Sequence, residues 1–255
     1  MGLWTNLILE VGKLKARLNK AAGVEVFDDF PSDFDRFTIE LIKRTSPYTM
    51  TSRERIASLE DAVRYIVDSG IPWAIVECGV WRGGSMMAAA LTLRDIGEIG
   101  RDLFLFDTFE GMPTPGDKDV SVTGKPARAT WNTRLVNGES QWCRCELDVV
   151  QANLCATGYD QDRIHFVKGM VEDTLPCDAI EVIALLRLDT DWYDSTKWEL
   201  EQLFPLLAPG GVLIIDDYGR WQGCRRAVDE YFAESGVNML LTRVDSYARI
   251  VGVKP

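Results

Sequence analysis

The chain alternates between short continuous runs of hydrophobic residues and longer stretches in which hydrophobic residues recur at helical spacing. Strands buried on both faces of a parallel sheet read as continuous runs, whereas helices with one buried face show the spaced pattern. The continuous runs are 74–78, 102–109, 163–167, 183–189 and 212–215. The spaced stretches are 86–93, 145–157, 196–207 and 222–235. This alternation predicts an α/β fold with a doubly wound, mostly parallel sheet.

Two further apolar runs close the chain, at 238–244 and 247–253, and Asp245-Ser246 is all that separates them. So short a connection predicts an antiparallel hairpin. Added to the five earlier runs, this hairpin completes a Rossmann-like sheet of seven strands.

Helical patterns also precede the first strand. Residues 3–20 form an amphipathic pattern, a second helix is expected to about Arg44, and a third begins at the capping box 51–54 and ends at Gly70. We therefore divide the chain into a helical cover or interface segment, residues 1–72, and an α/β domain, residues 73–255. The stretch 110–144 is rich in Gly, Pro, Thr and charge, and loops of this length are usually functional lids.

Composition narrows the choice of partners. The net charge of −11, from 39 acidic and 28 basic residues, argues against nucleic acid. No run reaches the roughly 18 apolar residues that a membrane span needs, and the six cysteines show no zinc-ligand spacing. We expect a cytoplasmic protein that acts on a small molecule. The amphipathic stretch 3–20 favours a homo-oligomer formed through the N-terminal helices over membrane binding.

Carboxylates follow two of the predicted strands at the point where each strand ends. Asp189 and Asp191 lie at the end of the run 183–189, and Asp216 and Asp217 follow the run 212–215. Open α/β folds bind ligands at this carboxyl edge, and neighbouring strands are about 4.8 Å apart. Because clustered carboxylates repel one another, their convergence predicts a divalent cation with oxygen ligands.

The turn after the first strand indicates the class of cofactor. Its glycines, Gly79, Gly83 and Gly84, give the spacing GxxxGG, and Trp81 and Arg82 lie within the turn. A dinucleotide fold requires GxGxxG so that the backbone can approach a pyrophosphate, so this spacing fits NAD poorly. With Glu77 before it, the turn instead fits the acidic-x-Gly pattern of S-adenosylmethionine (SAM) methyltransferases. A purely structural strand-to-helix turn is the alternative.

Two later strand ends agree with a nucleoside cofactor. Asp107 ends the second strand, where a ribose commonly receives its carboxylate. After the third strand, Gly169 allows close approach and Glu172 offers an acceptor for an adenine amino group. An ordinary β-to-α connection would also explain the second of these signals.

A set of motifs from about residue 46 to the C-terminus resembles one known family. The motifs are Tyr48–Ser52 with Glu54-Arg55, Glu77–Gly84, Phe106–Pro113, Gly169 with Asp173–Pro176, Leu188–Thr196, Pro209–Gly211 and Asp216–Tyr218. In combination they are similar to the TylF/MycF (macrocin-type) family of metal-dependent O-methyltransferases. Residues 1–45 match no pattern of that family.

The resemblance implies a class I methyltransferase that uses SAM as the methyl donor and Mg²⁺ at Asp189, Asp216 and Asp217. It also implies an aspartate base at Asp191, which agrees with the absence of a suitable histidine, since the single one, His165, lies within a strand. The acceptor would be a hydroxyl group, in characterised members that of a deoxysugar on a natural product. We expect the loop 110–144, the segment Tyr48–Glu54 and Trp221 to close over this acceptor and exclude water. The residues expected to bind the donor are Met50, Thr51, Glu77, Gly79, Trp81, Arg82, Ser85, Asp107, Thr108, Gly169, Met170 and Glu172.

Three alternatives differ from this interpretation. A catechol-type O-methyltransferase would methylate a phenol with the same metal arrangement, but that family carries a lysine base where this chain has Trp192. A NAD-dependent sugar oxidoreductase is disfavoured by the glycine spacing and by the lack of a Tyr-x-x-x-Lys pair. A non-catalytic binding protein would have no need of four converging acids.

Overall fold

The computed structural model describes residues 30–245 and 249–255. Residues 41–255 form one compact unit, and the described residues 30–40 fall outside it. The amphipathic pattern at 3–20 lies outside the described residues, so its helix and its interface stay predictions. The expected second helix is α2 (Arg36–Thr45), which begins after Asp35, whose Oδ1 accepts a hydrogen bond from the Thr38 amide at 2.8 Å.

The unit formed by residues 41–255 contains the predicted seven-stranded sheet, with the order β5-β2-β1-β6-β7-β9-β8. Its strands are β1 (Ala74–Cys78), β2 (Leu103–Asp107), β5 (Ile164–Lys168), β6 (Ile183–Leu188), β7 (Leu207–Ile215), β8 (Thr242–Arg243) and β9 (Ile250–Val253). The first five are parallel, and β9 is antiparallel to both β7 and β8. The predicted architecture and terminal hairpin are confirmed, although β8 is shorter than the apolar run suggested.

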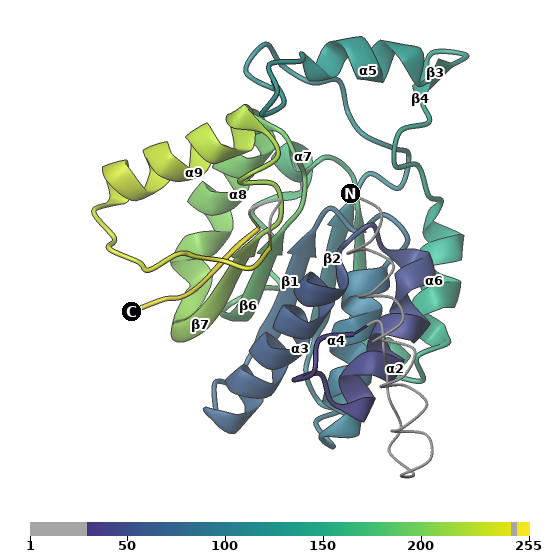
Figure 1. Cartoon of the computed structure of the whole chain (residues 1–255), viewed down its shortest axis with the longest axis vertical. Coiled ribbons are helices and arrows are strands. Elements are labelled where there is room, and N and C mark those ends of the chain that lie inside the picture. Colours follow the sequence, from purple (N-terminus) through teal and green to yellow (C-terminus); the bar gives the residue numbers. More distant parts are fainter. Residues whose placement is uncertain (1–29, 246–248) are drawn as a thin grey trace, which may run out of the picture. The chain divides into compact units, whose positions relative to one another are not determined.

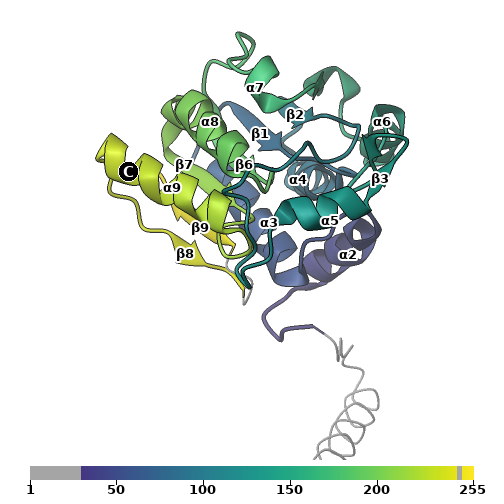
Figure 2. The same cartoon turned by 90° about the horizontal axis from the view of Figure 1, so that it is seen from above.

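Helices cover both faces of this sheet (Figures 1 and 2). On one face α3 (Arg53–Asp68), α4 (Gly84–Asp95) and α6 (Leu147–Cys155) pack in succession, and on the other lie α7 (Val171–Thr174), α8 (Tyr193–Leu203) and α9 (Gln222–Ser235). Short 3-10 turns η1 (Ser46–Tyr48), η2 (Gln161–Arg163) and η3 (Phe204–Leu206) join some of these elements. None of the helices in the described ranges is both long and apolar enough to cross a membrane.

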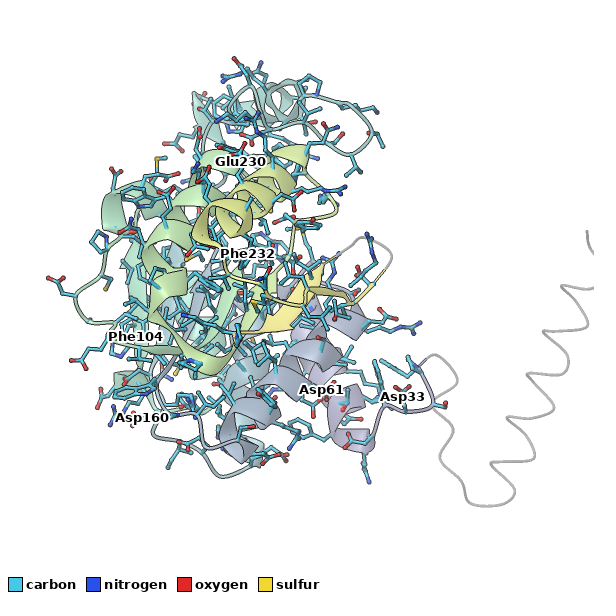
Figure 3. The ribbon with its side chains drawn as sticks, turned by 90° about the vertical axis from the view of Figure 1, so that its left-hand side faces the viewer. Asp33, Asp61, Phe104, Asp160, Glu230 and Phe232 are labelled. Atoms are coloured by element: carbon cyan, nitrogen blue, oxygen red, sulfur yellow. The ribbon has the colours of Figure 1, made fainter. Side chains whose placement is uncertain are left out.

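Aromatic packing fastens α9 to the rest of the unit. Phe232 of α9, labelled in Figure 3, meets the ring of Phe204 almost perpendicularly, with centroids 5.3 Å apart. On the same helix, Glu230 accepts a hydrogen bond from the Tyr193 hydroxyl of α8. The second half of α9 is therefore held against α8 and against Phe204, just after α8 ends.

The stretch 110–144 contains regular structure that we expected to be loop. It holds α5 (Ala127–Thr133) and a small hairpin of β3 (Leu135–Val136) and β4 (Glu139–Ser140). The hairpin turns at Asn137-Gly138, both with positive φ (52° and 85°), a pair typical of two-residue hairpin turns. The prediction of an unstructured loop was wrong here because this local turn signal was overlooked.

The first strand-to-helix turn packs directly on the acidic strand end. Gly79 has φ +83°, and a Cβ there would lie 2.1 Å from the Asp189 carbonyl oxygen. A hydrogen bond joins the two backbones next to this contact, from the Asp189 amide to Cys78 O at 2.8 Å. Only glycine fits, because any side chain would push the two strand ends apart.

Gly79→Ala should destabilise the fold by at least about 2 kcal/mol more than Gly124→Ala, because it adds a backbone collision to the strain of a left-handed residue. Gly124 is a matched control: its φ is also +83°, but nothing lies within 4 Å of the Cβ position. Urea unfolding of both variants measures the difference. Equal free energies of unfolding would show that the close approach at Gly79 carries no cost.

Candidate active site

One pocket opens at the carboxyl ends of the parallel strands, where open α/β sheets bind ligands. Fourteen of the sixteen residues predicted for the site line it. They are Met50, Thr51, Gly79, Trp81, Ser85, Asp107, Thr108, Gly169, Met170, Glu172, Asp189, Asp191, Asp216 and Asp217. The structure thus brings together residues that are up to 167 positions apart, between Met50 and Asp217.

The two remaining predicted residues, Glu77 and Arg82, lie outside the pocket wall. Glu77 is buried beneath it and pairs with Arg187, its neighbour across β1 and β6. Arg82 is exposed, with its guanidinium 4.9 Å from the centre of the Trp81 ring. A direct contact between either side chain and a donor molecule stays a prediction.

Asp107 is held rigidly at one end of the pocket. Its Oδ2 accepts hydrogen bonds from the backbone amides of Val80 (2.7 Å) and Trp81 (3.0 Å), and its Oδ1 accepts from Phe109 (2.8 Å). The glycine turn and the end of β2 are therefore tied by one carboxylate. Oδ2 thus accepts two hydrogen bonds already, whereas Oδ1 still has a lone pair for a further donor such as a sugar hydroxyl.

The glycine turn also fixes the segment that precedes α3. A Cβ on Gly84 would lie 2.6 Å from the backbone carbonyl of Tyr48, so the two backbones are in direct contact. This contact places Met50 and Thr51 in the pocket wall, where 67% of Met50 remains exposed. An exposed apolar side chain at a pocket mouth is available to cover a ligand.

The three predicted metal ligands meet at the centre of the pocket. Asp189, Asp216 and Asp217 each offer an oxygen within 4.8 Å of the others. The register of the sheet causes this, since Leu188 pairs with Ile215 and the Asp216 amide donates to Leu188 O at 2.9 Å. Strand pairing alone therefore puts the acids at one point.

Three arginines surround Asp216. Arg55 Nη1 lies 2.6 Å from its Oδ2, and Arg187 Nη2 and Arg249 Nε lie 2.8 and 3.2 Å from its Oδ1. Burial alone would raise the pKa of Asp216, but the arginines outweigh burial and lower the pKa to about 2. Asp216 is therefore an ionised carboxylate within the fold.

The charges of Asp189 and Asp217 are balanced by fewer arginines than the charge of Asp216. Arg187 Nη2 lies 2.8 Å from Asp189 Oδ2, yet burial together with repulsion from Asp216 and Asp217 raises the pKa of Asp189 well above its ordinary value. Burial and the nearby Asp191 and Asp216 raise the pKa of Asp217 in the same way. Asp217 Oδ2 is buried and has no hydrogen-bond partner among the described residues.

A divalent cation fits this arrangement. The three guanidiniums share their surroundings with five carboxylates, those of Glu77, Asp189, Asp216, Asp217 and Asp245. If all five are ionised, the group has a net charge of −2 (three positive charges against five negative ones), and Asp217 Oδ2 is buried without a partner among the described residues. Hard oxygen donors of this kind suit Mg²⁺.

Asp191, the predicted base, stands beside the three acids in a constrained turn. Its φ is +66°, rare for a residue with a side chain, and the Trp192 amide donates to Thr190 O across it at 2.8 Å, the bond of a γ-turn. Burial raises the pKa of Asp191 to about 7, against the effect of hydrogen bonds with Asp217 and Trp221. Strained residues of this kind cluster at functional sites.

Trp221 occupies a different place from the one expected. We expected it to close over an acceptor, but it is buried beneath Asp191 and does not line the pocket. Its ring packs against those of Trp192 and Trp142, at centroid distances of 5.1 and 6.1 Å, and these two rings also pack against each other. This aromatic packing holds it below the pocket floor.

The arginines were the main omission from the predicted site. Arg187 interrupts the apolar run 183–189, and a charge within a buried strand requires a partner, so this signal was present in the sequence. Arg55 and Arg249 come from opposite ends of the chain. Nothing in their local sequence indicates that they meet at Asp216.

Arg187→Met should destabilise the protein by about 3–5 kcal/mol, because Glu77 and Asp216 stay buried without the positive charge that pairs with them. Arg163→Met is the control: its pair with Asp102 is half exposed at 3.3 Å, and its loss should cost about 0–1 kcal/mol. Adding Glu77→Gln to Arg187→Met should recover part of the loss. Urea titrations measure all three, and an Arg187→Met variant as stable as the control would refute the role of this ion pair.

Comparison with known proteins agrees with the geometry. The model of the macrocin O-methyltransferase (TylF) family matches residues 32–251. The chain is 35% identical over 198 residues to 8-demethyl-8-(2,3-dimethoxy-α-L-rhamnosyl)-tetracenomycin-C 4'-O-methyltransferase of Streptomyces olivaceus, covering 78% of this chain and 72% of the relative. It is 33% identical over 201 residues to mycinamicin III 3''-O-methyltransferase of Micromonospora griseorubida, covering 79% and 76%.

Among solved structures, the O-methyltransferase NovP superposes with a TM-score of 0.71 at 28% identity, covering 81% of this chain and 82% of its own. The sheet order and this likeness identify the fold as that of class I SAM methyltransferases. These findings remove the alternatives of a NAD-dependent oxidoreductase and of a non-catalytic binding protein. The chain belongs to the macrocin O-methyltransferase (TylF) family and is a methyltransferase.

Proposed function

We propose that this protein transfers a methyl group from SAM to a hydroxyl of a deoxysugar on a natural product, with Mg²⁺ held by Asp189, Asp216 and Asp217. The observation that carries the proposal is the position of Asp191. A constrained carboxylate stands beside the three-acid cluster, in the same pocket as the residues expected to bind the donor.

The acceptor class is taken from the relatives. One is named for the 4' position of a compound that carries a rhamnosyl group, and another for the 3'' position of mycinamicin III. Trp192 argues against a catechol-type acceptor, since it stands where that family carries a lysine base and is itself buried.

The cation would polarise the acceptor hydroxyl and make its proton easier to remove. Asp191 would accept that proton as the oxygen bonds to the methyl carbon, while the bond from that carbon to the donor's sulfonium breaks and the donor leaves as a neutral thioether. A base works best when its pKa is close to the working pH, and burial brings the pKa of Asp191 to about 7. An exposed aspartate with an ordinary pKa would be a much weaker base.

The donor would lie along the other half of the pocket. Asp107, fixed by three backbone amides, would accept a hydrogen bond from a ribose hydroxyl. Glu172 accepts a hydrogen bond from the Ser195 hydroxyl at 2.8 Å and would accept another from the adenine amino group. Gly79 and Trp81 would form the wall between the donor and the strand ends.

Asp191→Asn should lower kcat by about 10²–10⁴-fold, because the general base is lost, while the Kd for SAM changes little. The assay is mass spectrometry of the methylated product from SAM and an acceptor with a free rhamnosyl hydroxyl, with and without EDTA. Asp194→Asn is the matched control, since that side chain lies three positions further on and is 75% exposed.

Wild-type protein should lose activity in EDTA and regain it with Mg²⁺, and Asp194→Asn should behave like the wild type. Full activity in EDTA would refute the metal, and full activity of Asp191→Asn would refute the base. Methylation of a catechol without any methylation of rhamnosyl acceptors would refute the proposed acceptor class.

A further inference from the structure

The Trp221 indole has a single N–H group, and that group contacts the proposed base. Its indole Nε1 donates a hydrogen bond to Asp191 Oδ1 at 2.5 Å. An indole N–H is a donor and never an acceptor, so it cannot receive the transferred proton. What it can do is hold one oxygen of Asp191 in place.

Trp221 is itself fixed from several directions. Its amide donates to Asp217 O at 3.0 Å, it precedes the first turn of α9, and its backbone pairs with Ser121 of the long loop. Its ring meets Trp192 nearly at right angles, at 74°. With 5% of its surface exposed, the indole has no room to turn away from Asp191.

The backbone of Asp191 is constrained by the γ-turn described above. Trp192 forms that turn through its amide and is anchored by its own indole, which donates to Pro113 O at 3.1 Å. Backbone and carboxylate of Asp191 are thus fixed by two adjoining tryptophans. The direction of the remaining carboxylate oxygen then follows from the position of the first.

We infer that Trp221 is a positioning residue, whose indole N–H fixes Asp191 Oδ1 and leaves the other carboxylate oxygen directed for the acceptor proton. The inference rests on the proposed function, in which Asp191 is the base. Since Trp221 does not line the pocket, it acts through Asp191 and makes no contact with the acceptor. A small misplacement of a reacting group can cost about 100-fold in rate.

Trp221→Phe keeps an aromatic ring and removes the N–H. We expect kcat to fall by about 10–100-fold, with the acceptor KM and the Kd for SAM within about threefold of wild type. Trp198→Phe is the control, because Trp198 Nε1 is buried and has no partner among the described residues, and it should change none of these values. A Trp221→Phe variant with unchanged kcat, or with a change confined to KM, would overturn the inference.

A double-mutant cycle separates positioning from a general structural effect. If Trp221 acts through Asp191, Trp221→Phe should cause no further loss of kcat in an Asp191→Asn background. A full additional loss in that background would overturn the inference. Full activity of Asp191→Asn alone would refute the proposed function itself, because Asp191 would not be the base. That result is distinguishable from one that refutes only the role of Trp221.

A spectroscopic test applies even if Trp221→Phe does not fold. The indole N–H resonance of Trp221, assigned among those of the eight tryptophans, should lie downfield because its acceptor is charged. Asp191→Asn keeps Trp221 but neutralises that acceptor, and should move this resonance upfield while the Trp198 resonance stays in place. An unmoved Trp221 resonance would overturn the contact on which the inference depends.

Discussion

The ion pair between Glu77 and Arg187 lies at the base of the site. These residues are direct neighbours on β1 and β6, the two central strands, and both are buried. From this position Arg187 reaches beyond the sheet to Asp189 and Asp216. Burying a charge pair costs desolvation free energy. In return, the same arginine fixes two acids, Asp189 and Asp216, at the carboxyl edge of the sheet.

In this site the negative charge of some acids is balanced by neighbouring arginines, and that of others is not. Asp216 has three arginine partners, whereas Asp217 has an oxygen without a partner in the described part of the chain. If arginines balanced every carboxylate, no negative charge would remain to bind a cation. If no arginine were present, repulsion between the carboxylates would destabilise the fold. The observed arrangement lies between these limits, as the proposed cation site requires.

The sequence allowed the sheet and the acid cluster to be predicted for one reason. Acids at the ends of parallel strands must meet on one edge, so Asp189, Asp216 and Asp217 were placed together by topology alone. The pairing of Glu77 with Arg187 was not predicted, since it depends on which residue lies opposite Glu77 in the register of the sheet.

Contacts set by tertiary packing could not be predicted in the same way. Arg55 and Arg249 reach Asp216 from α3 and from the last strand pair, and no local pattern marks either. Trp221 was mistaken for a cover because its hydrophobicity says nothing of the direction of its N–H. The Asn137-Gly138 hairpin, by contrast, had a readable signal.

The most direct test of this account is cation binding by the isolated protein, without donor or acceptor. Titration with Mn²⁺, followed by electron paramagnetic resonance and competed with Mg²⁺, should show one ion bound per chain. Asp217→Asn should weaken binding by at least about tenfold, while Asp229→Asn, a half-exposed acid on α9, should leave it unchanged. Equal binding by the wild type and Asp217→Asn would contradict the proposed site at the strand ends.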